Sequence, residues 1–261
     1  DGVYFEFTGV NAGFLAYGMA SVTGGNGVIV MLNSGDDVNG LGKEIRRAVA
    51  KVYNWKNFLP AEIQPIHLSD KSLENRAGRY RIGPNEVLYL QKEKNYWVEN
   101  INDGNDIYCF PVSEDSLVFT DYNIKAGFKF NENGEAISLQ NIYQEKPMPK
   151  MKDNEFSPNE YLKMKNYVEA KKAFGVMKMN EYQITYLAYD LLNKKPLDLM
   201  AVKILLEIAK EQHPNSSIVF SRWGDYFLKL NDKQNAIINY QRAVELDPSD
   251  ENSKKVLRRL L

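Results

Sequence analysis

Phe5-Glu6-Phe7-Thr8-Gly9-Val10-Asn11-Ala12-Gly13-Phe14 opens the stretch that decides how this chain folds, and Val28-Ile29-Val30-Met31-Leu32-Asn33 closes it. Between them lie a second apolar run to Ala20 and a turn at Thr23-Gly24-Gly25-Asn26-Gly27. Short apolar runs separated by glycine and asparagine are typical of paired strands. Asn26-Gly27 favours a tight hairpin because both residues tolerate positive φ. The stretch therefore predicts three strands joined by two turns.

An amphipathic helix is predicted to follow these strands. Asp36-Asp37 can cap its N-terminus, and the segment ends at Tyr53-Asn54-Trp55. The charged side chains fall mostly on one side of the predicted helix. The opposite, apolar face comprises Leu41, Ile45, Ala48, Val49 and Val52.

This order of elements, over roughly residues 4 to 58, resembles the C-terminal end of a β-lactamase-related, penicillin-binding-protein-like serine hydrolase. In that family a strand carries a Lys-Thr-Gly or His-Thr-Gly signature beside a Ser-x-x-Lys nucleophile motif. Thr8 and Gly9 match the signature, but Phe7 stands where the family has a cation. A phenyl ring neither holds a carboxylate by charge nor passes a proton. The resemblance implies the bacterial periplasm or cell envelope, and a piece of a longer chain that begins upstream of Asp1.

The chain lacks the nucleophile that the resemblance would require. No serine in the 261 residues is followed three positions later by lysine. Loss of the nucleophile alone costs a serine protease on the order of a million-fold in turnover. Glu6 is the only carboxylate near the signature, and a single carboxylate does not define acid–base catalysis. We therefore expect no catalytic residue here, and we expect Thr8 and Gly9 to serve as sheet residues.

Composition excludes several classes of function. Lys and Arg number 33 against 34 Asp and Glu, so the net charge of −1 provides no general attraction for nucleic acid. No apolar run approaches the roughly 20 residues of a membrane helix. His67 and His213 are far apart, and Cys109 is the only cysteine, so we expect neither a metal site nor a cofactor. We expect both histidines at the surface and Cys109 to be buried.

Residues 59–150 have the pattern of a small antiparallel β domain. Alternation along two of its strands predicts that Phe128 and Phe130 share one face, and that Ile137 and Leu139 share one. The aromatic residues can fill the interior of a barrel or sandwich, or line a cavity for an apolar ligand. The predicted strands are 78–82, 87–92, 96–99, 107–110, 116–120, 127–131 and 135–142.

Residues 151–261 have a helical pattern, which Ser157-Pro158 opens as an N-cap followed by proline. The predicted helices are 158–174, 181–192, 197–212, 216–230, 233–246 and 250–261. Residues 217–250 form a 34-residue unit that resembles a tetratricopeptide repeat. Its matching residues are Phe220, Trp223, Gly224, Phe227, Ala236, Tyr240, Ala243 and Pro248.

A degenerate copy of this unit precedes it, and the last helix is expected to close the stack. Repeats of this kind present a surface that can receive a protein or peptide segment. By the geometry of the repeat, the candidate binding residues are Ser221, Asp225, Leu228 and Lys229. The alternative is that the helices only stabilise the β domain.

These observations predict an α+β multidomain fold with three modules: 1–58, a remnant of a β-lactamase-like sheet with its C-terminal helix; 59–150, a β barrel or sandwich; and 151–261, an all-α tetratricopeptide-like domain. The predicted function is that of a non-catalytic, protein-binding accessory region of a serine hydrolase. The alternatives are a free-standing adaptor and a small barrel that binds an apolar ligand. A sheet of three strands leaves apolar surface exposed, so we also expect self-association through residues 4–33 or coverage by the β domain.

Overall fold

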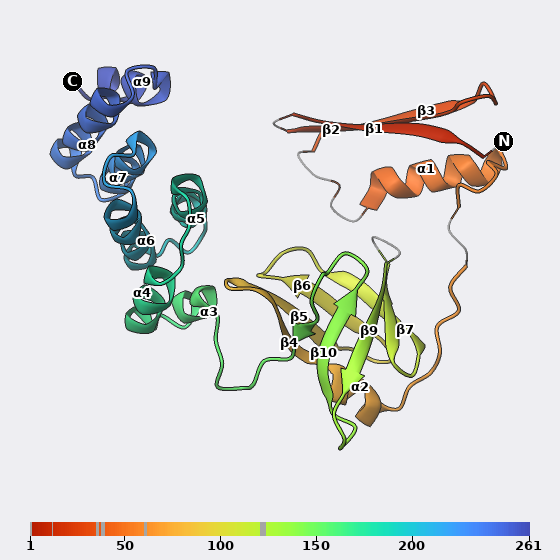
Figure 1. The fold of residues 1–261 in the computed structure, drawn as a ribbon. Helices are drawn as coiled ribbons and strands as arrows, with labels where there is room; N and C mark the ends of the chain where they lie inside the picture. Colours follow the sequence, from red (N-terminus) through yellow and green to blue (C-terminus); the bar gives the residue numbers. More distant parts are fainter. Residues whose placement is uncertain (1, 12, 35–36, 38–39, 60–61, 121–123) are drawn as a thin grey trace. The chain divides into compact units, whose positions relative to one another are not determined.

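The computed structural model describes residues 2–11, 13–34, 37, 40–59, 62–120 and 124–261. The chain divides into two compact units, one of residues 1–81 with 87–150 and one of residues 82–86 with 151–261 (Figure 1). The three-module division remains a prediction. Across the described residues, no helix has both the length and the apolar character needed to cross a bilayer.

The N-terminal strands form the predicted antiparallel sheet in the order β1 (Tyr4–Asn11), β2 (Phe14–Ser21), β3 (Gly27–Leu32). The hairpin between β2 and β3 differs from the prediction. Gly25 rather than Asn26-Gly27 takes the positive φ, of 68°, and Gly27 already belongs to β3. The turn is longer than two residues, and it is closed by a hydrogen bond from the Ser21 amide to the Asn26 carbonyl.

Helix α1 (Leu41–Val52) covers one face of this sheet (Figure 1). The predicted apolar face of the helix is largely exposed, with Val52 at 75% and Leu41 at 56% exposure. The helix buries Gly42 and Ala50. A Cβ added at Gly42 would lie 2.4 Å from the Tyr17 ring, so close packing through small residues sets the helix rotation. The apolar period of the sequence did not show which side of the helix packs on the sheet, because that contact is made by glycine and alanine.

The N-cap residue of α1 is Gly40, and a carboxylate of the predicted Asp36-Asp37 pair binds the amides of the first turn. Asp37 accepts hydrogen bonds from the amides of Gly42, at 2.9 Å, and Lys43, at 3.3 Å. The Tyr17 hydroxyl donates to the same carboxylate at 3.0 Å and thereby ties the helix to the sheet. Asp36 lies outside the described residues.

The β domain is an eight-stranded antiparallel sheet that runs in chain order from β4 to β11. Its two ends approach each other at a bridge between Tyr80 and Lys150, so the sheet is a nearly closed barrel. The short helix α2 (Asp70–Arg76) packs on this barrel, where the Trp97 indole donates to the Leu73 carbonyl at 3.0 Å. The strands are β4 (Gly78–Gly83), β5 (Glu86–Lys92), β6 (Trp97–Ile101), β7 (Ile107–Ser113), β8 (Ser116–Phe119), β9 (Ile124–Phe130), β10 (Ala136–Asn141) and β11 (Met148–Pro149).

Side chains occupy the barrel interior. Trp97 and Tyr80 are fully buried and Phe128 is 6% exposed, which favours core filling over a ligand cavity. The predicted shared face of Ile137 and Leu139 is wrong. The pairing of β10 with β9 shifts between Ala136 and Ser138, so Ile137 is the extra residue of a bulge and points outward.

The C-terminal region consists of seven helices in the described residues. The predicted helix 158–174 is two helices, because Lys165 adopts a φ of 57° between them and Asn166 caps the second. A capping box at Ser157 and Glu160 opens the first, as the Ser157-Pro158 pattern predicted. The helices are α3 (Pro158–Lys163), α4 (Tyr167–Gly175), α5 (Glu181–Asn193), α6 (Leu199–Gln212), α7 (Ser217–Lys229), α8 (Lys233–Leu246) and α9 (Glu251–Leu260).

Candidate binding surface on the helical region

Successive helices pack as pairs, α3 with α4, α5 with α6 and α7 with α8, and α9 follows against α8. Between pairs, α7 contacts both α5 and α6, and α4 contacts α6. Figure 1 shows this succession from green to blue. The region is therefore a stack of helix pairs with one pair more than the sequence predicted.

Close approach of α7 and α8 depends on Gly224. A Cβ at this position would lie 2.7 Å from Cζ of Tyr240, whose side chain is 1% exposed. Ala236 and Ala243 on α8 are also fully buried. Large and small residues thus pack between α7 and α8 as the 34-residue pattern predicted. In the preceding pair Ala188 is likewise fully buried.

A row of exposed aromatic side chains lies on α5. Tyr182, Tyr186 and Tyr189 are 64%, 67% and 45% exposed. They occur at positions i, i+4 and i+7, which share one face of a helix. The buried residues of the helix, such as Ile184 and Ala188, lie on other faces. We call these three residues the tyrosine row.

The tyrosine row continues onto α7 through Arg222. The guanidinium carbon of Arg222 lies 4.8 Å from the centre of the Tyr189 ring. Its Nη1 donates to Oδ2 of Asp225 at 2.7 Å, and the Tyr240 hydroxyl donates to Oδ1 of the same carboxylate at 2.6 Å. Both oxygens of Asp225 are therefore used inside the repeat, where they hold Arg222 against the row.

Two of the four predicted binding residues make contacts between helices. Asp225 makes the contacts just described, and Ser221 accepts a hydrogen bond from the Ser253 hydroxyl of α9 at 3.0 Å. Leu228 is half-buried, and Lys229 is exposed at the end of α7. The structure thus leaves Lys229 with the most accessible side chain, and the role of all four in binding remains a prediction.

The tyrosine row and Arg222 were not predicted as binding residues. The spacing of the three tyrosines was visible in the sequence, because it follows a single helical face. Arg222 carried no comparable signal, since its contact with Tyr189 joins residues from two repeats.

The residues that matched the hydrolase signature lie in β1, where Phe7, Thr8 and Gly9 pair with Gly18, Tyr17 and Ala16. The ring of Phe7 extends over Gly18, where an added Cβ would lie 2.1 Å from it. The neighbouring carboxylate, Glu6, forms an ion pair with Arg46 at 3.1 Å. These contacts are those of sheet residues.

The remaining positions considered in the sequence are Cys109 and the two histidines. Cys109 is buried, as expected. His67 is exposed, whereas His213 is half-buried with Nε2 2.8 Å from the Met179 carbonyl oxygen. Among the described residues, no group of three or more His, Cys, Asp or Glu side chains is placed to hold a metal ion. Ser216 is the N-cap of α7, although its side chain makes no capping hydrogen bond.

Together these features define an α+β protein with a barrel-like antiparallel sheet and a C-terminal stack of helix pairs. No protein-family model matches the chain, and no curated protein matches it.

Solved structures show partial similarity. The first TPR of Spaghetti (RPAP3) bound to the HSP90 peptide SRMEEVD is 21% identical over 40% of this chain and 83% of that chain, with a TM-score of 0.30. The first TPR domain of the human RPAP3 protein has the same identity and coverage and a TM-score of 0.29. SurE with D-Leu is 14% identical over 57% of this chain and 36% of that chain, with a TM-score of 0.33. Similarity this low assigns no function, and the serine-hydrolase resemblance stays a prediction.

Proposed function

We propose that the helical region is a protein-interaction module that binds an extended, proline-rich peptide segment along the tyrosine row. The observation that carries this proposal is the alignment of three exposed tyrosines on α5 with Arg222 of α7 at one end. Exposed aromatic rings in a row provide flat apolar surfaces and hydroxyl groups, which are the features that receive polyproline II segments.

Dimensions and charge favour this ligand. Tyr182 and Tyr189 are separated by about 10.5 Å along the helix axis at 1.5 Å per residue. One turn of a polyproline II helix advances by about 9.3 Å, so prolines one turn apart match the ends of the row. The positive charge of Arg222 is paired with Asp225, so the row has little excess charge with which to select a strongly acidic or basic segment.

The proposal is tested by calorimetric titration of the whole chain with a twelve-residue proline-rich peptide and with a Gly-Ser peptide of equal length. We expect binding of the first peptide only. Tyr186→Ser should weaken it at least tenfold, because stacking on the central ring is lost. Tyr143→Ser is the matched control, since Tyr143 is 73% exposed in a turn of the β domain. Equal affinity of both variants, or no binding to the wild-type chain, would refute the proposal.

The binding residues predicted from the repeat are tested in the same assay. Lys229→Glu changes an exposed charge and should alter affinity only if the segment extends to the end of α7. Reversal of the Asp225 charge is a poor test, because it also removes the hydrogen bond from Tyr240 and the ion pair with Arg222.

A second proposal is that residues 1–58 belong to a β-lactamase-related serine hydrolase of the periplasm or cell envelope, with this chain as a non-catalytic accessory region. Its support is the order β1, β2, β3, α1, which agrees with the architecture that the resemblance implies. The gene upstream of Asp1 should then encode Ser-x-x-Lys and Tyr-x-Asn, and the 261-residue chain should not hydrolyse a chromogenic cephalosporin or ester. Turnover well above buffer would contradict it.

A further inference from the structure

The N-terminal sheet has an open apolar face opposite α1. Five large side chains of this face are exposed by more than half: Phe5, Phe7, Phe14, Ile29 and Met31. These five residues would be core residues if a second layer covered this face of the sheet. Contiguous apolar surface of this kind marks an interaction site.

The large and small residues of this face lie in three rows that run across the strands. The strand register places Phe5, Ala20 and Gly27 in the first row. The second row is Phe7, Gly18 and Ile29, and the third is Gly9, Ala16 and Met31. The first row is therefore large on β1 and small on β3, whereas the third is small on β1 and large on β3.

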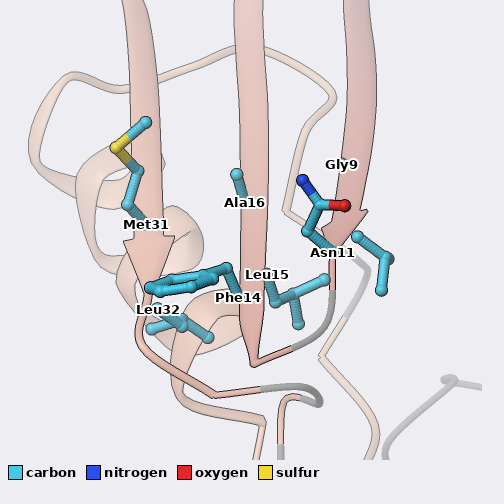
Figure 2. A pocket seen from close by; sticks show the side chains of 8 residues that line it. Gly9, Asn11, Phe14, Leu15, Ala16, Met31 and Leu32 are labelled. Carbon is cyan, nitrogen blue, oxygen red and sulfur yellow. The ribbon is translucent and has the colours of Figure 1, made fainter. Parts of the chain in front are cut away.

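The third row borders a hollow. A cavity of about 400 Å³ is lined there by Gly9, Asn11, Phe14, Ala16 and Met31, among others. Figure 2 shows Met31 on one outer strand and Gly9 on the other, with Ala16 between them. The hollow is large enough for a large side chain and is lined mostly by apolar atoms.

This arrangement is complementary to itself. A two-fold axis that lies in the plane of the face, along the second row, places the first row of one copy over the third row of another. Phe5 of each copy then meets Gly9 of the other, and Met31 meets Gly27. In these two rows large residues fall on glycines, and Ala16 meets Ala20 on β2. In the second row, which lies on the axis, Phe7 meets Phe7 and Ile29 meets Ile29 of the other copy, and the Phe7 ring covers Gly18.

We propose that the open face is a homodimer interface, in which two copies pack face to face about this two-fold axis. Area supports a second copy as the occupant. With about 200 Å² for each side chain, the area of an aromatic one, the exposed fractions of these five residues amount to about 600 Å² per copy. Complete coverage of this surface in two copies buries about 1,200 Å², which is the lower end of a specific interface. Two-fold homodimers are also the commonest oligomers.

The decisive variant is Gly9→Val. An added Cβ at Gly9 would lie 4.0 Å from Cβ of Ala16, so the monomer has room for a side chain, and valine suits a strand. In the dimer the same side chain fills the position of Phe5 from the other copy. Light scattering coupled to size exclusion should show a dimer for the wild-type chain and at least a tenfold larger dissociation constant for Gly9→Val.

Gly127→Val is the matched control, because Gly127 is an exposed strand glycine of β9 with its nearest neighbour at 3.9 Å. It should leave the dissociation constant unchanged. Adding Phe5→Ala to Gly9→Val should recover dimerisation relative to Gly9→Val alone, because the two side chains meet across the interface. Circular dichroism checks that each variant is folded.

A second measurement keeps the test valid if Gly9→Val fails to fold. Leu41→Lys changes the exposed face of α1, and Met31→Lys changes the open face of the sheet; both residues are exposed. Only Met31→Lys should dissociate the dimer. A wild-type chain that is still monomeric at a concentration of about 100 μM, where a micromolar dissociation constant gives mostly dimer, would overturn the proposal. Dissociation by Leu41→Lys alone would also overturn it.

Discussion

Gly224→Ala tests the packing of α7 on α8. The new Cβ would meet three atoms of the Tyr240 ring, at 2.7, 2.8 and 2.9 Å. The ring cannot move away freely, because its side chain is buried and its hydroxyl donates to Asp225 at 2.6 Å. The helices must therefore separate or the hydrogen bond must lengthen.

The magnitude follows from two opposing effects. Overpacking of a core costs about 1 to 3 kcal/mol, and contact with a fixed ring lies at the upper end. Replacement of glycine by alanine in a helix gains about 1 kcal/mol. We therefore expect the free energy of unfolding of the helical region to fall by about 2 kcal/mol, since the clash exceeds the gain in propensity.

The assay is urea unfolding of the whole chain followed by circular dichroism at a helical wavelength. A loss of about 2 kcal/mol lowers the midpoint by roughly 1 M urea. Gly175→Ala is the control, because Gly175 lies at the end of α4 with no heavy atom near an added Cβ, and it should be neutral or stabilising. Tyr240→Leu should relieve most of the effect of Gly224→Ala. A Gly224→Ala chain as stable as wild type would refute this reasoning.

Two predictions concern buried polar groups. Arg76 is 5% exposed and donates to the Ser72 carbonyl at 2.7 Å and to the Glu114 carbonyl. Arg76→Ala should therefore lower the stability of the barrel by about 2 to 4 kcal/mol. An unchanged melting temperature would contradict this prediction. Burial, followed by the hydrogen bond to Asp225, raises the pKa of Tyr240 above its usual value near 10. The stability that the neutral phenol contributes is complete below about pH 10 and is lost as pH rises beyond it, so the urea midpoint should fall more steeply between pH 9 and 11 in wild type than in Tyr240→Phe. Equal slopes would contradict the second prediction.

The sequence predicted helix starts and helix pairs well where the deciding residues lie at a fixed spacing along the chain. Ser157 with Pro158 predicted a helix start, and the 34-residue unit that contains Gly224 and Tyr240 predicted a packed helix pair, because caps and repeat packing depend on residues at fixed spacing. The single predicted helix over 158–174 was wrong, because nothing in its apolar period marks Lys165 as a residue with positive φ.

The candidate site was predicted only in part. The sequence predicted a binding surface on the helical repeats that included Asp225 and Ser221. It did not indicate that these two residues accept hydrogen bonds from Tyr240 and Ser253. Tyr240 and Ser253 lie on other helices, and the periodicity of residues within a single helix does not predict such contacts. The same holds for Arg222, which meets Tyr189 across two repeats.

The sequence by itself determined which segments are strands and which are helices, the N-terminal three-stranded sheet and the 34-residue helical unit, because hydrophobic period and turn residues act over a few positions. Only the tertiary structure decided how α1 rotates on its sheet and which residues share rows on the open face. Those features depend on Gly42 lying against Tyr17 and on strand register, which are set by contacts between distant residues.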